Sequence, residues 1–194
     1  MGRKSIDLAL ATPAQWVQTI LDNFDEFLQD HANCERKASA LAMSMVVKHP
    51  DREEIIGALV TLAQEELEHF GQVYEVMRAR GLPLVKDTPD PYVNALGAHM
   101  RHGREQRFLD RMLVSSVVEC RGAERFGLIY QALDEPELKE FYRQLWAAET
   151  KHGHQFVDMV LKYFSADEVY ARLEELMVLE ARIVESLPWR PSLH

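Results

Sequence analysis

Glycine and proline are scarce in this sequence, with nine and eight residues respectively among 194. Alanine, leucine, glutamate, arginine and methionine are plentiful, and this balance favours helices. No segment shows the strict alternation of apolar and polar residues that is typical of a half-buried strand. We therefore expect an all-α protein.

The sequence also lacks a long apolar run. No stretch approaches the roughly 18 apolar residues of a membrane-spanning helix, and the N-terminal MGRKSIDLAL has basic residues without the apolar core of a secretion signal. Two cysteines do not make a disulfide framework. A net charge of −9 argues against nonspecific nucleic-acid binding. These absences predict a cytoplasmic protein with no membrane association.

Helix breaks divide the chain into long helical segments. The predicted helices cover about 13–48 with a break near Asn23, then 51–80, 104–133, 136–164 and 166–186. Three prolines mark residues 81–95 as a long connection, whereas the other links are short. This order predicts a ferritin-like four-helix bundle with one long crossover and extra short and C-terminal helices. We expect a single domain over 1–194, with the core bundle at about 13–164.

Two Glu-x-x-His pairs are the main chemical signal. Residues three apart on a helix share a face, and each pair follows a lone glutamate, by 31 residues in the first case and 30 in the second. This is the donor set of a two-metal centre inside a four-helix bundle. The predicted metal ligands, through which catalysis would occur, are Glu35, Glu66, His69, Glu119, Glu149 and His152.

The apolar pattern indicates that these donors point inward. Glu66 and His69 share a helical face with Leu62 and Val73. Buried carboxylates without a cation would repel one another and lose hydration. Oxygen donors with one imidazole per ion suit iron or manganese better than a structural zinc. Glu124 is a rival to Glu119, and the symmetry of the spacing favours Glu119.

Small residues follow the upstream glutamates. Gly122 and Ala123 lie one turn beyond Glu119 on the same face. They either allow ordinary close helix packing or leave space beside the metals for dioxygen and part of a substrate. Phe126 and Tyr130 continue this face and either line that space or belong to the core.

Four segments carry a resemblance to a known family. They are HANCERKASALA (31–42), LAQEELEHFGQVYEVMRARG (62–81), VVECRGAERFGLIY (117–130) and AAETKHGHQFVDM (147–159). With them, the chain resembles the bacterial tRNA-(2-methylthio-N6-isopentenyladenosine) hydroxylases. The resemblance implies a diiron monooxygenase that uses dioxygen to hydroxylate the isopentenyl group of a hypermodified adenosine next to the anticodon. It also implies that the six donors above bind the iron.

The sequence has no glycine-rich dinucleotide loop and no cysteine cluster. We therefore expect electrons to come from a separate reductase or a ferredoxin-like partner. A tRNA substrate also requires phosphate contacts. Arginines recur at helical spacing in RHGREQRFLDR, and they form either a basic stripe or a solvated face with local salt bridges: Arg101, Arg104, Arg107 and Arg111. Lys86, Arg3 and Lys4 would extend such a stripe.

The metal pattern alone fits other ferritin-like proteins. One alternative is a ferroxidase or another iron-handling protein, which would require assembly into a cage. The other is a quinone-pathway hydroxylase, which would need an exposed apolar surface at the membrane. Both alternatives share the predicted fold and differ in substrate.

Overall fold

The computed structural model describes residues 6–194, which contain helices and connecting segments and no strand. The predicted all-α class is therefore confirmed for these residues. None of the helices in this range combines the length and apolar character needed to span a bilayer. Arg3 and Lys4 lie outside the described residues. The helices are α1 (Ala14–Asp22), α2 (Phe24–Lys48), α3 (Glu53–Ala79), α4 (Pro91–Ala98), α5 (Arg104–Ala132), α6 (Pro136–Val160) and α7 (Ala166–Ser186).

The backbone divides into two compact units. The α2–α3 unit contains Ala14–Thr88 and Trp189–Leu193, and the α5–α6 unit contains residues 6–13, Pro89–Pro188 and His194. Each unit is described by itself below. The predicted organisation as one domain over 1–194 stays a prediction.

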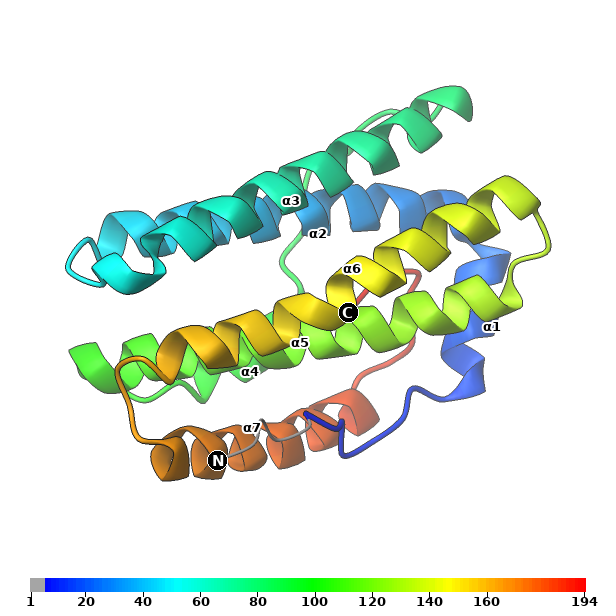
Figure 1. The fold of residues 1–194 in the computed structure, drawn as a ribbon. Coiled ribbons are helices and arrows are strands. Elements are labelled where there is room, and N and C mark those ends of the chain that lie inside the picture. The colour runs from blue at the N-terminus through cyan, green and yellow to red at the C-terminus, as the bar shows by residue number, and fades with distance from the viewer. Residues whose placement is uncertain (1–5) are drawn as a thin grey trace. The chain divides into compact units, whose positions relative to one another are not determined.

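In the α2–α3 unit, the two long helices lie side by side and run in opposite directions (Figure 1). The chain reverses at His49–Pro50, because the residue before a proline is pushed out of helical geometry. Apolar side chains at helical spacing, among them Phe27 and Leu62, are buried. Trp16 of α1 packs edge-on against Phe27, with ring centroids 6.5 Å apart. The predicted break near Asn23 separates α1 from α2.

In the α5–α6 unit, α5 and α6 also form an antiparallel pair, and α7 packs against α5 (Figure 1). Pro136 occupies the first turn of α6, where its missing N–H costs nothing. Ser165 caps α7 by accepting a hydrogen bond from the backbone N–H of Glu168 at 3.2 Å. These start signals correctly predicted where both helices begin.

Two details differ from the sequence prediction. The crossover contains α4, because the Asp90 carboxylate accepts a hydrogen bond from the N–H of Tyr92 at 2.8 Å and Pro91 is already constrained for a first helical turn. The helix predicted for 136–164 ends at Val160. Its carbonyl accepts from the N–H groups of both Tyr163 and Phe164, which form a turn there.

The segment before α1 is fastened to α5. Thr12 donates its backbone N–H to one oxygen of Glu124 at 2.7 Å and its hydroxyl to the other at 2.6 Å. Arg121 donates to the carbonyl of Leu10 at 2.8 Å. Residues 6–12 therefore follow α5 without being helical.

Candidate metal centre and comparison with known proteins

The first cluster of donors lies in the α2–α3 unit. Glu35 comes from α2, and Glu66 and His69 come from successive turns of α3. One ligand atom from each of the three lies within 4.8 Å of the others. His69 Nδ1 is 3.8 Å from an oxygen of Glu35 and 3.7 Å from an oxygen of Glu66. All three side chains are buried.

His31 supports this cluster and was missed by the sequence prediction. Its Nε2 lies 2.7 Å from Glu35 Oε1, one helical turn away on α2, and the side chain is fully buried. Phe27 stacks on the imidazole with ring centroids 5.6 Å apart and so restricts its rotation. The spacing of four residues before a ligand glutamate was the available signal, because such residues are neighbours on a helix.

The second cluster lies in the α5–α6 unit. Glu119 comes from α5, and Glu149 and His152 come from α6. Their ligand atoms also lie within 4.8 Å of one another, and His152 Nδ1 is 2.7 Å from Glu149 Oε2. Glu149 and His152 are buried, whereas Glu119 is partly exposed. Each unit thus contributes two carboxylates and one imidazole.

A serine hydrogen bond fixes the helix pair beside each cluster. Ser39 on α2 donates to the carbonyl of Ala63 on α3 at 2.7 Å. Ser116 on α5 donates to the carbonyl of Gly153 on α6, also at 2.7 Å. A Cβ at Gly153 would lie 2.5 Å from Cys120 Sγ, so only glycine allows this approach of α5 and α6. These contacts set the distance between helices that supply donors to the same cluster.

The donor chemistry of each cluster fits a metal ion. Bonds from oxygen or nitrogen ligands to small divalent cations are roughly 2 Å long, so ligand atoms up to about 4 Å apart can share one ion. Two carboxylates and a neutral imidazole also offset the charge of a divalent cation without thiolates. Each of the two carboxylate–histidine clusters is therefore consistent with binding of a metal ion.

Glu124, the rival to Glu119, is engaged elsewhere. It binds Thr12 and forms an ion pair with Arg121 at 2.7 Å.

Cys120 is a free thiol. Burial, and then the charges of Glu119 and Glu180, raise the pKa of Cys120 to about 12, which keeps it neutral at physiological pH.

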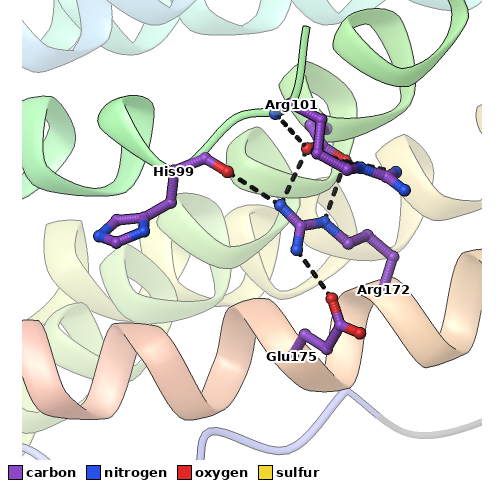
Figure 2. A network of polar contacts seen from close by, with 5 residues as sticks. His99, Arg101, Arg172 and Glu175 are labelled. Carbon is purple, nitrogen blue, oxygen red and sulfur yellow. Dashed lines mark hydrogen bonds and ion pairs between the residues drawn. The ribbon is translucent and has the colours of Figure 1, made fainter.

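The predicted arginine stripe divides into two kinds of environment. Arg101 forms a bidentate ion pair with buried Asp110, and Arg172 of α7 binds the same carboxylate at 2.9 Å. Arg172 also donates to the carbonyl of His99 and to Glu175 (Figure 2). Asp110 of α5 therefore binds both Arg101, in the segment before α5, and Arg172 of α7, and so holds α7 against α5.

The other arginines of the stripe are placed differently. Arg104 and Arg107 are exposed. Arg111 is half-buried, and its pKa is lowered first by burial and then by the nearby charge of Arg107. Two positive charges therefore lie close together on α5. Phe126 is buried against Tyr142, with centroids 5.8 Å apart.

A family model covers nearly the whole chain. The model for tRNA-(MS2IO6A)-hydroxylase (MiaE) matches residues 3–194. The chain belongs to the MiaE family. A Pseudomonas putida protein named tRNA 2-(methylsulfanyl)-N(6)-isopentenyladenosine(37) hydroxylase is 30% identical over 179 residues, which cover 92% of this chain and 87% of that protein. The Salmonella typhimurium protein of the same name is 26% identical, over 90% of this chain and 82% of the relative.

A solved structure matches this MiaE-family chain closely. It is described as protein 43 with aldehyde deformylating oxygenase activity from Synechococcus, and it has a TM-score of 0.91 and 34% identity. The match covers 96% of this chain and 94% of the other. This likeness confirms the predicted ferritin-like fold, and the family match confirms the resemblance drawn from the four sequence segments.

Proposed function

We propose that this chain hydroxylates the isopentenyl group of a hypermodified adenosine next to the anticodon of tRNA, with dioxygen as oxidant and two iron ions as cofactor. The family match over residues 3–194 carries the proposal. The Glu/Glu/His clusters support it, because in each unit two carboxylates and one imidazole place ligand atoms within 4.8 Å of one another, close enough to hold one ion. A tRNA substrate also supports the predicted cytoplasmic location.

We assign one ion to each cluster. Glu35, Glu66 and His69 would hold the first, and Glu119, Glu149 and His152 the second. When bound, such an iron pair supplies the oxidising power for attack on an unactivated C–H bond. The chain's own part is to hold the donors in place. His31 restrains Glu35, and the bonds of Ser39 and Ser116 fix the helices that carry the donors.

Electrons and tRNA contacts complete the proposal. We expect an external reductase or a ferredoxin-like protein as electron donor, as the sequence predicted. We assign tRNA phosphate contacts to the exposed part of the arginine stripe, with Arg107 and half-buried Arg111 adding to one local positive charge. Direct tRNA contact by Arg101 and Phe126 stays a prediction.

Mass spectrometry of tRNA nucleosides tests this function. A strain lacking the gene would receive the wild-type chain, Glu66→Ala or Glu68→Ala. Glu68 is a matched control because it lies on α3 but is exposed. We expect the wild type and Glu68→Ala to restore the hydroxylated nucleoside, and Glu66→Ala to leave the unhydroxylated precursor. If Glu66→Ala fully restores the hydroxylated nucleoside, Glu66 is not a metal ligand. If the wild-type chain does not restore it, the proposed function is rejected.

The solved relative supports a second candidate function. Its title gives aldehyde deformylating oxygenase activity, and its 34% identity extends over 96% of this chain. Purified, iron-loaded protein with a reductant and aldehydes would be assayed for formate, in parallel with tRNA. Formate production without tRNA hydroxylation would favour this second function over the first.

A further inference from the structure

The α5–α6 unit contains a cavity of about 400 Å³. Its wall includes Glu149, one of the proposed metal ligands, so the cavity adjoins the second cluster. It also includes exposed residues such as Asp7 and Thr150, so the cavity reaches the protein surface. The cavity thus leads from solvent to a metal ligand within one unit.

Three segments build the wall from side chains at helical spacing. From α6 come Trp146, Thr150 and His154, which repeat every four residues and therefore share a face. From α5 come two small side chains, Cys120 and Ala123, and the carboxylate of Glu124, which is bound to Thr12. The N-terminal segment adds Ile6, Leu8 and Ala11, held in place where Thr12 and Leu10 bind α5. The wall is thus largely apolar, with polar groups between.

We propose that this cavity receives the modified adenine, that Trp146 is the surface on which the base stacks, and that the small side chains Cys120 and Ala123 leave room for the branched alkyl group. The proposal rests on the proposed function and assigns the substrate-contacting residues of that site. A cavity of this size lies within the range of roughly 300–1,000 Å³ that is typical of small-ligand pockets. A purine with a five-carbon substituent fits such a volume.

Trp146 is prepared for stacking. The residue is 36% exposed. Tyr130 stacks against it with centroids 5.9 Å apart and an interplanar angle of 23°. A Cβ on Gly127 would lie 3.1 Å from two indole atoms, so glycine at this point of α5 lets the ring lie close to the helix. Aromatic side chains that receive nucleic-acid bases need such a fixed, accessible face.

The test measures single-turnover hydroxylation by iron-loaded protein on an anticodon stem-loop RNA that carries the isopentenyl adenosine. We expect Trp146→Ala to lower the rate on the order of tenfold to a hundredfold, the scale of one lost base–aromatic stack. Trp146→Phe should retain most of the rate because it keeps an aromatic face. Ala123→Leu should lower the rate by filling the cavity. Gln144→Ala is the control, because Gln144 is exposed on α6 outside the cavity wall.

Gly127→Ala tests whether the position of the Trp146 ring matters, because this variant keeps the tryptophan and only moves it. The added methyl group would displace the indole by a few tenths of an ångström while alanine favours the helix. We expect thermal stability to be kept and the hydroxylation rate to fall. Iron content should stay close to wild type in all variants, because none of the substituted residues is a proposed metal ligand.

Tryptophan fluorescence supplies a second readout. Stem-loop RNA with the isopentenyl group should quench wild-type fluorescence, and Trp146→Phe should abolish that change. Wild-type rates in both Trp146→Ala and Ala123→Leu would overturn the cavity assignment while leaving the proposed function intact. If the wild type fails to hydroxylate the RNA, the proposed function fails. The cavity assignment then stands only if quenching requires both Trp146 and the isopentenyl group.

Discussion

We expect that breaking the buried ion pair between Arg121 and Glu180 lowers the stability of the fold more than breaking any other polar contact described above. Both side chains have no exposed surface, and their atoms approach to 2.7 Å and 2.9 Å in a bidentate arrangement. Burial lowers the pKa of Arg121, but Glu180 and Glu124 more than reverse this and raise it overall. Arg121 is therefore a permanent buried cation that needs its partner.

We expect Glu180→Ala to leave that cation partly uncompensated. Removal of one partner of a buried pair costs roughly 3–5 kcal/mol. Each kcal/mol shifts the melting temperature of a chain of this size by about 2–4 °C, so the melting temperature should fall by roughly 6–20 °C. Burial, and then the charge of Arg121, lower the pKa of Arg125 to about 10, and the charge of Glu180 opposes this shift. Removal of Glu180 therefore also destabilises the buried Arg125 cation, which adds to the loss of stability.

Thermal unfolding of the metal-loaded protein, followed by circular dichroism, measures the effect. Glu185→Ala is the matched control, since Glu185 is exposed near the end of the same helix. The double variant Arg121→Met with Glu180→Leu should regain much of the lost stability, because neither charge then remains buried alone. A loss below about 1 kcal/mol in Glu180→Ala would contradict this reasoning.

Three further perturbations follow from the structure. Burial raises the pKa of Asp110, but hydrogen bonds and charges from Arg101 and Arg172 outweigh burial, and the net pKa lies below the ordinary value of 3.8. Ionised Asp110 therefore stabilises the folded protein above about pH 4, and this stabilisation is lost as the pH falls through the lowered pKa. Asp110→Asn should flatten this acid-side decline in thermal unfolding scans between pH 2.5 and 6. Arg107→Glu should weaken tRNA binding and reduce the slope of log affinity against log salt by roughly 0.7–0.9, whereas Arg78→Glu, on a paired and exposed residue of α3, should not. His31→Leu should lower iron affinity roughly 10- to 100-fold by freeing Glu35, and unchanged iron retention during dialysis against a chelator would reject that role.

Local sequence patterns predicted much of the fold. The helix boundaries at Gly81, Pro136 and Ser165 followed from start and stop signals that act over one or two turns. Gly81, for example, has φ of 71°, which suits glycine at a helix end. The donors of each cluster were also readable from sequence, because a spacing of three residues fixes a shared helical face.

Contacts between distant segments were not readable in this way. Arg121 looks like a surface residue in the segment ECRGAERF, yet its partner Glu180 lies 59 residues away. The course of residues 6–12 along α5 depends on the same network, and it decides which residues line the cavity. No periodicity in the sequence carries that information.

Helix α4 was missed for a different reason. Its Asp90–Pro91 start signal is present in the sequence, but the segment is only eight residues long and stands among prolines. Its stability comes from packing, since Tyr92 is buried and donates to Glu180 at 3.0 Å. Short helices of this kind depend on tertiary contacts more than on propensity.

Mössbauer spectroscopy of the purified protein loaded with iron-57, combined with its iron content, tests the central claim most directly. If the six donors hold one two-metal centre, the protein should bind about two irons per chain and the oxidised iron should appear as a spin-coupled pair. Glu66→Ala should lose the coupled signal, and Glu68→Ala should keep it. One iron per chain, or iron with an uncoupled spectrum in the wild type, would contradict the account.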